Sequence, residues 1–365
     1  MPATPEFSRV LARLRDAEHP VSMSSLYQLS DLAGADLEAL EGAWAELPVE
    51  RRRNILADLN EIGEANFEVT FESIFRLALE DEDAEVRATA IRALWETEDA
   101  TLIAPLLQFL AHDPDVQVRA AAGSGLGRFV YLGEVEELPT AQARRVEEAL
   151  LNVVGGADAL EVRRRALEAV AYASRPEVAP LIEAAYASSE PRLRVSAVFA
   201  MGRTAEAKWG PRVLAELNSP EPEMRYEAVR AAGELELRDA GPNLARLVSD
   251  PDTQVREAAI WSLGQIGGEL ARKTLKQLRR RVTDEDERDF IDEAIDNLAF
   301  SDEVRALAAA EGEVAAADDE AFLSGLMRFD DDEDDEDDEA DDLDDLDLDD
   351  LDFDDGLDDD EDAEA

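Results

Sequence analysis

The sequence has no cysteine and only 2 histidines among its 365 residues. Without cysteine the chain can form no disulfide, zinc–thiolate site or iron–sulfur cluster, and it has no thiol nucleophile. Two histidines leave little for a histidine-rich metal centre. Basic residues are also scarce, 36 against 88 acidic ones, and the formal net charge is −52. Because such a charge repels phosphate backbones, we expect no direct binding to nucleic acid.

Long apolar runs are missing as well. One of the longest uncharged stretches, Ala100 to His112, has 13 residues, which is too short for a helix that spans a bilayer. The opening segment alternates charged and apolar side chains and lacks the continuous apolar stretch of a signal peptide. We therefore expect a cytoplasmic protein that has no contact with a membrane.

The negative charge is unevenly distributed. In the segment 330–365, 26 of 36 residues are Asp or Glu and none is basic, and without this segment the formal charge of the chain is −26. Single Leu and Phe residues stand among these carboxylates, and no packed core can form against their mutual repulsion. We expect 330–365 to be a disordered acidic tail, which either engages a basic partner or only keeps the chain in solution.

A period of 31 residues organises the middle of the chain. An apolar residue followed by arginine recurs at spacings of 32, 44, 31, 31 and 31, and the long spacing contains a 13-residue insertion at 130–142. In every unit the fourth residue after the apolar one is alanine. A degenerate further copy surrounds Arg288. The recurring arginines are Arg87, Arg119, Arg163, Arg194, Arg225 and Arg256.

The same offsets predict the structure of one unit. Val255, Ala259, Ile260 and Leu263 follow the helical period and form one apolar stripe. An acidic residue three positions before the apolar reference, such as Asp252, stands where a helix begins and can cap its free amide groups. Each unit is therefore expected to be two antiparallel helices, and six or seven stacked units bury their apolar faces in one continuous core.

The sequence DTQVREAAIWSLG at 252–264 resembles the short HEAT-like repeats of the phycobilisome-lyase type that are found in bacterial proteins. The resemblance implies an all-α fold, an α-α superhelix of the HEAT/armadillo type, with the repeats at 71–300. The segment 1–70 is expected to be a divergent N-terminal helical cap, in which Arg53 takes the place of the recurring arginine.

The resemblance also implies a role for the recurring arginines. In such repeats the arginine and an acidic residue form a ladder between repeats, and we expect this structural role rather than ligand binding. The expected partners are Asp113 or Asp115 for Arg119, and Asp250 or Asp252 for Arg256.

One face of the second helices is a candidate binding surface. The offsets +2, +3, +6 and +10 lie opposite the packed side, and we expect this face to line the concave side of the superhelix. Four consecutive units place an aromatic residue there, and aromatics with arginine are enriched in interaction hot spots. The alternative is that the rings only cover gaps between repeats. The candidate partner-binding residues are Tyr172, Phe199, Arg203, Tyr226, Arg230 and Trp261.

The chain after the repeats offers two more candidates. The segment 301–329 reads as a linker that contains the apolar run AFLSGLMRF, either a recognition segment that folds upon binding, through Phe322, Leu326 and Phe329, or a capping helix. The basic stretch 272–281 is expected to be a solvated helix face, and it is also a candidate docking site for the acidic tail. Its basic residues are Arg272, Lys273, Lys276, Arg279, Arg280 and Arg281.

No catalytic pattern is recognisable. The paired histidine–glutamate motifs of di-iron HEAT-repeat hydroxylases are missing, and so is a phosphate-binding loop. We expect no catalytic residue, metal ligand or cofactor. The favoured function is a non-enzymatic scaffold or adaptor for one or more partner proteins. The alternatives are bilin-lyase-type chromophore attachment or chaperone activity, which the resemblance implies, and an acidic regulator that mimics nucleic acid.

Overall fold

The computed structural model describes residues 3–16 and 18–300, which belong to one compact unit. Regular secondary structure in these residues is helical throughout, so the expected all-α fold is confirmed. The linker 301–329 and the acidic tail 330–365 lie outside the described residues.

Four helices precede the repeats: α1 (Pro5–Arg15), α2 (Met23–Tyr27), α3 (Gly34–Trp44) and α4 (Val49–Ala65). Helix α4 packs against α6 of the first repeat. Arg53 on α4 donates to the carboxylate of Asp83 at 2.8 Å from Nε and 2.7 Å from Nη2. Asp83 is the N-cap of α6, whereas recurring arginines such as Arg87 bind a carboxylate two residues before the N-cap. The expected ladder role of Arg53 was therefore wrong: its neighbour Arg52 makes that contact, with Nε 2.8 Å and Nη2 3.1 Å from the carboxylate of Asp81.

Helix pairs follow one another from residue 72 onward. The first helices of the pairs are α5 (Glu72–Ala78), α7 (Ile103–His112), α9 (Thr140–Gly155), α11 (Val178–Tyr186), α13 (Gly210–Glu216), α15 (Gly241–Leu247) and α17 (Gly268–Arg281). The second helices are α6 (Ala84–Ala93), α8 (Val116–Glu134), α10 (Leu160–Val170), α12 (Pro191–Arg203), α14 (Pro222–Glu234) and α16 (Thr253–Ile266). Helical backbone also covers 285–300.

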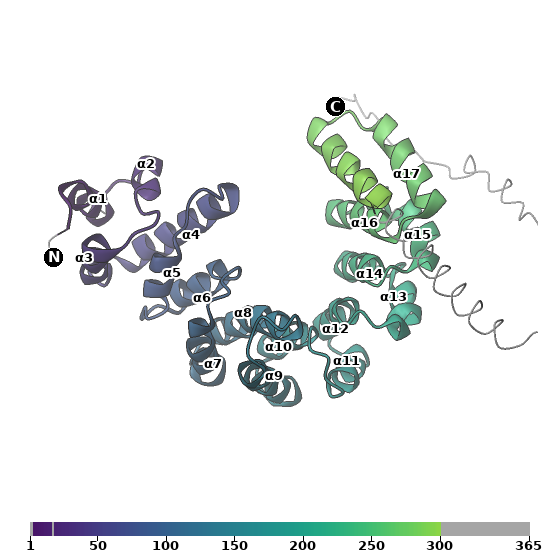
Figure 1. The fold of residues 1–365 in the computed structure, drawn as a ribbon, viewed down its shortest axis with the longest axis horizontal. Coiled ribbons are helices and arrows are strands. Elements are labelled where there is room, and N and C mark those ends of the chain that lie inside the picture. The colour runs from purple at the N-terminus through teal and green to yellow at the C-terminus, as the bar shows by residue number, and fades with distance from the viewer. Residues whose placement is uncertain (1–2, 17, 301–365) are drawn as a thin grey trace, which may run out of the picture. The chain divides into compact units, whose positions relative to one another are not determined.

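Each second helix packs against the second helix of the next pair, as α8 does on α10 and α14 on α16. Figure 1 shows the second helices along one side of the row and the first helices along the other. Short 3₁₀ turns, Ala100–Leu102, Ala207–Trp209 and Arg238–Ala240, lead into α7, α13 and α15.

The acidic residue before each second helix stands at the cap, as its offset predicts. Asp83, Asp115 and Asp252 occupy the N-cap and accept hydrogen bonds from backbone N–H groups of the first turn. Glu190 and Glu221 hold the same position without a side-chain cap bond. Each of these two is followed by proline, which has no N–H to satisfy at the first helical position, and the glutamate charge still favours the positive helix end.

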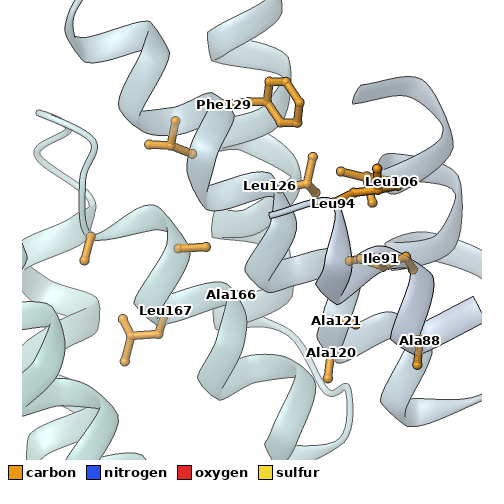
Figure 2. Close-up of a cluster of buried hydrophobic side chains, with 14 of the residues drawn as sticks. Ala88, Ile91, Leu94, Leu106, Ala120, Ala121, Leu126, Phe129, Ala166 and Leu167 are labelled. Carbon is orange, nitrogen blue, oxygen red and sulfur yellow. The ribbon is translucent and has the colours of Figure 1, made fainter. Parts of the chain in front are cut away.

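The recurring alanine belongs to the buried core of each second helix. All six copies are fully buried, with an exposed fraction of 0%. Figure 2 shows part of this core, where Leu94, Leu106 and Leu126 gather between α6, α7 and α8. A methyl group is the largest side chain that lets two helix backbones approach so closely. The copies are Ala90, Ala122, Ala166, Ala197, Ala228 and Ala259.

The glycine five residues after the recurring alanine also lets one second helix approach the next closely. A Cβ atom placed at Gly127 would lie 3.2 Å from the Cα of Ala169, and one at Gly202 would lie 2.9 Å from the Cα of Ala231. Both neighbours are backbone atoms of the following second helix, which cannot move aside. These glycines are required by the close approach of successive helices.

Three arginines of the ladder bind a carboxylate of the next repeat through two N–H groups. Arg87 Nε and Nη2 each lie 3.0 Å from the carboxylate of Asp113. The Nη1 group of the same arginine donates to the carbonyls of Asp81 and Glu82 in its own repeat. One guanidinium thus joins two consecutive loops, and Arg225 does the same with Asp250.

The expected partners of Arg119 and Arg256 were wrong. Arg119 binds the carboxylate of Asp158, one repeat further on, at 3.1 Å from Nε and 2.8 Å from Nη2. Its contact with Asp113 is to the backbone carbonyl only, because Arg87 already occupies that carboxylate. Arg256 likewise donates to the carbonyl of Asp250, whose carboxylate binds Arg225.

The two remaining ladder arginines have other contacts. Arg194 pairs with Glu216 at 3.2 Å, and Arg163 Nε donates to the carbonyl of Val154 at 3.2 Å. The insertion at 130–142 forms the end of the long helix α8, the loop after it and the start of α9. This repeat therefore differs from the others before Arg163.

No helix of the described residues is long and apolar enough to cross a membrane.

We predict that Gly233→Ala lowers the free energy of unfolding by about 1–3 kcal/mol, because its new methyl group would overlap a well-packed contact. A Cβ there would lie 2.7 Å from Ser262 Oγ and 2.8 Å from the ring of Trp261. In the control, Gly42→Ala in α3, no atom lies within 4 Å of the new Cβ, and alanine should stabilise the helix by about 0.5–1 kcal/mol. Urea denaturation measures both, and shifts of the same sign would contradict the prediction.

Candidate protein-binding surface

The six candidate binding residues of the repeats lie on one side of four consecutive second helices, and each is half-buried. Their positions follow from the helical period, which turns the offsets +6 and +10 away from the packed stripe. We call these six residues, together with Arg128 and Tyr131, the aromatic–arginine face: Arg128, Tyr131, Tyr172, Phe199, Arg203, Tyr226, Arg230 and Trp261.

Two arginines of this face each lie over two aromatic rings. The guanidinium carbon of Arg203 is 5.6 Å from the ring centroid of Tyr172 and 4.9 Å from that of Phe199. A guanidinium within about 6 Å of a ring centroid is attracted by the negative ring face. The rings belong to neighbouring repeats, so the arginine connects them while the rings remain partly exposed.

Arg230 repeats this arrangement one step along the chain. Its guanidinium carbon is 5.9 Å from the ring of Tyr226 and 5.6 Å from the ring of Trp261. The rings therefore do pack against neighbouring helices, as the alternative interpretation of the sequence proposed. Their half-burial shows that packing and an accessible surface coexist here.

Arg128 and Tyr131 extend the face by one repeat and were not among the predicted residues. Arg128 lies 5.4 Å from the ring of Tyr131, which meets Tyr172 edge to face at 6.1 Å and 80°. Arg128 has the offset +10 of its repeat, as Arg203 has, and this could have identified it. Tyr131 lies in the insertion, where the period gives no information.

A single carboxylate lies between the two stacked arginines. Glu234 Oε1 is 2.9 Å from Arg203 Nη1 and 3.4 Å from Arg230 Nη2. Burial raises the pKa of Glu234, and the two arginines act against that rise. The carboxylate thereby fixes both guanidinium groups over their rings. The Nε of Arg203 is buried without an acceptor among the described residues. Its guanidinium lies over the rings of Tyr172 and Phe199 instead.

A second polar cluster supports the face between α10 and α12. Ser196 Oγ donates to Glu168 at 2.6 Å, and Arg165 Nη1 is 2.7 Å from the same carboxylate. Arg164 is buried and donates through Nε to Ser196 and to the carbonyl of Arg192. Glu168, which the sequence places beside Tyr172, is therefore held by two partners from two helices.

Glu227 on α14 has an unusual environment. Burial raises its pKa to about 7, Arg230 acts against the rise, and the carboxylates of Glu168 and Glu234 add to it. A carboxyl group that takes up a proton near neutrality thus lies beside the stacked arginines. The sequence carries no signal for Glu227, because one glutamate among 88 acidic residues is not distinctive.

The surface is hollowed in two places along the face. A hollow of about 520 Å³ is lined by residues of α6, α8, α10 and α12, including Tyr172, Phe199 and Arg203. A smaller one of about 310 Å³ is lined by Tyr226, Arg230 and other side chains that include Trp261 and Phe290. All six predicted face residues therefore line one hollow or the other.

The family model for HEAT repeats matches residues 72–148 and 210–299. These two stretches of the chain match HEAT repeats, as the resemblance implied. No curated protein matches the chain significantly.

Several solved structures are similar to the HEAT array. YibA of Escherichia coli is 18% identical, with a TM-score of 0.38, and the match covers 66% of this chain and 96% of that one. The CpcE–CpcF complex of phycocyanin lyase from Nostoc sp. is 18% identical with a TM-score of 0.40, covering 62% and 94%. Human deoxyhypusine hydroxylase is 20% identical with a TM-score of 0.34, covering 81% and 96%. Similarity at this level transfers no activity or partner to the chain.

The basic stretch lies on α17 of the HEAT array. Arg279 binds both carboxylate oxygens of Asp292 in the following helical segment. Lys273, Lys276 and Arg280 are exposed.

The candidate residues Phe322, Leu326 and Phe329 lie outside the described residues. Within 3–16 and 18–300, no group of three or more His, Asp or Glu side chains is placed to hold a metal ion.

We predict that Glu227→Gln stabilises the protein in a pH-dependent way. Because the folded-state pKa is about 7, ionised Glu227 lowers stability progressively as pH rises from about 4.5 to 7 and fully above that. Glutamine does not titrate, so the variant should match the wild type near pH 4.5. It should gain up to about 3 kcal/mol above pH 7.

Urea denaturation at pH 5 and pH 8 measures this difference. The control is Glu257→Gln, which removes an exposed carboxylate from the neighbouring helix α16. A gain for Glu227→Gln that is equal at both pH values, or that Glu257→Gln reproduces, would show that general charge repulsion causes it.

Proposed function

We propose that the protein is a non-enzymatic scaffold or adaptor. In this proposal the aromatic–arginine face binds a partner protein, and the acidic tail engages or screens a basic partner. HEAT repeats favour protein interaction in general, and the match to that family supports this part of the proposal. The specific observation that carries it is the pair of arginines stacked over four half-buried rings in consecutive repeats.

The geometry of the face suits binding because its side chains are already ordered. Arg203 and Arg230 would otherwise lose considerable conformational freedom on contact with a partner, and Glu234 together with the rings has removed that freedom beforehand. Preorganisation of this kind lowers the entropic cost of association. Tyr, Trp and Arg are also the residue types that dominate binding energy in protein interfaces.

The tail supports the second part of the proposal through its composition alone. A segment with 26 acidic residues and single Leu and Phe residues between them matches a basic surface with apolar grooves. Attraction of that kind weakens with salt because the charges are exposed. Mimicry of nucleic acid would be one use of such a segment.

The alternative of chromophore attachment rests on the resemblance of the repeats, and fold similarity does not carry an activity.

We predict that Phe199→Ala/Trp261→Ala weakens partner binding at least about tenfold, because both anchors of the face are truncated. The control is Tyr27→Ala, which removes a more exposed aromatic ring, 42% accessible, from α2 outside the face. Affinity purification from the native organism with the wild type, both variants and a chain ending at Phe300 identifies the partners, and titration with the purified partner gives the affinity.

The expected result is that one set of partners depends on the face and not on the tail. A second set should disappear with the tail and with rising salt. Recovery of the same proteins by all four chains would refute the scaffold proposal. Circular dichroism must show equal helicity for the two variants, so that a loss of binding is not a loss of fold.

A further inference from the structure

The larger hollow of the face has an aromatic wall that reaches beyond the predicted residues. Trp95, which directly follows the end of α6, is 59% exposed and lines the hollow together with Tyr131, which is 42% exposed. Tyr172 and Phe199 line the other end. Such a concentration of accessible rings in one hollow of about 520 Å³ is typical of a binding site for apolar side chains.

The lining of this hollow is rich in arginine. Four arginines line it against one carboxylate, Glu168, although residues 1–329 carry a formal charge of −26. The four belong to four different second helices, so the concentration arises from the packing of the repeats. They are Arg92, Arg128, Arg165 and Arg203. Three of these arginines also pair with a carboxylate: Arg128 with Glu98, Arg165 with Glu161 and Arg203 with Glu234.

Two of these arginines still have donors for a ligand. Arg92 is exposed and bonds Thr89 Oγ1 through Nη2, and Arg128 pairs with Glu98 through Nη2. Within the described residues, neither Nη1 group has an acceptor in these contacts. A guanidinium has five N–H donors and binds a carboxylate through two of them. The hollow can therefore receive acidic side chains next to its rings.

Trp95 also lines a second hollow, which is acidic. This hollow of about 650 Å³ is lined by residues of α4 and α5 among others, and its lining includes Phe67 but no Lys or Arg. The arginine lining is thus a local property of the α6–α12 side. The acidic side chains that line the second hollow are Glu64, Glu72, Glu96, Glu98 and Asp99.

We propose that the hollow lined by Trp95 and Arg128 binds an acidic segment of a partner protein in which carboxylates alternate with apolar side chains. The carboxylates pair with Arg92 and Arg128, and the apolar side chains pack on Trp95 and Tyr131. This proposal rests on the proposed function and gives the chemistry of the partner. A basic segment would meet four arginines, and the many phosphates of a nucleic acid strand would meet the repulsion of the acidic protein.

Isothermal titration calorimetry with synthetic peptides tests the proposal, on the full chain and on the chain ending at Phe300. The second chain is needed because residues 330–365 also combine carboxylates with single apolar residues and would compete with an acidic peptide. The probe is a short peptide in which Glu alternates with Leu and Phe. One comparison peptide has Lys in place of Glu, and another has Ser in place of Leu and Phe. Oligothymidylate is the nucleic acid probe. The variants are Arg92→Gln/Arg128→Gln and Trp95→Ala, and the control is Arg246→Gln, which removes an exposed arginine from α15 outside the hollow.

We expect the Glu–Leu–Phe peptide to bind the wild type and Arg246→Gln equally. Its affinity should fall at least about tenfold with either hollow variant, as truncation of a hot-spot residue does. The Ser peptide should bind at least about tenfold more weakly than the probe. The Lys peptide should bind acidic surfaces with an affinity that the hollow variants leave unchanged.

The proposal is overturned if the acidic peptide binds neither the full chain nor the chain ending at Phe300, or if its binding is unaffected by both hollow variants. It is also overturned if oligothymidylate binds more tightly than the peptide and depends on the same arginines. Failure here would leave the scaffold proposal intact, because the purified partner can still depend on Phe199 and Trp261. Failure of both experiments would refute the scaffold as well.

Discussion

The close approach of successive second helices is the constraint on which the structure depends. It exists because a buried alanine and a glycine recur at fixed offsets, so that one helix backbone lies directly against the next. The repeat distance set in this way is short enough for one arginine to cover rings from two repeats, as Arg203 does. The same distance lets Arg87 reach Asp113. Larger side chains at those offsets would move the helices apart and break both the arginine–ring contacts and the arginine–carboxylate contacts.

Much of the fold could be predicted because it repeats. The period gave the helix pairs, the caps at Asp83 and Asp252, and the side of the helices on which Phe199 and Trp261 lie. A period says which residues are equivalent, but not which neighbour a long side chain reaches, and the partner of Arg119 was therefore assigned one repeat too early. Features that occur only once could not be predicted from the period, such as the exposed Trp95 and the raised pKa of Glu227.

Charge serves different purposes in different parts of the chain. In the repeats, many carboxylates are tied to arginine, and the hydrogen bonds from Arg53 lower the pKa of Asp83 to about 2. These pairs fix loops and rings and add little to the field of the protein. The carboxylates of 330–365 have no basic residue within their own segment, which therefore carries half of the net charge, −26 of −52. Against that background one hollow is distinctive, because four arginines and one carboxylate line it.

The junction between α10 and α12 differs from its neighbours in one respect. Arg163 donates to the carbonyl of Val154 in its own repeat, whereas Arg119 and Arg225 clamp a carboxylate of the repeat that follows. The ladder contact is therefore missing at this junction, and Arg192 in the first turn of α12 instead pairs with Glu161 of α10 at 3.3 Å. Tyr172, Arg203 and Phe199 cross the same junction on the opposite side. A partner bound to these three side chains would add a further connection between the two repeats. The array would therefore be stiffer with the partner bound than without it.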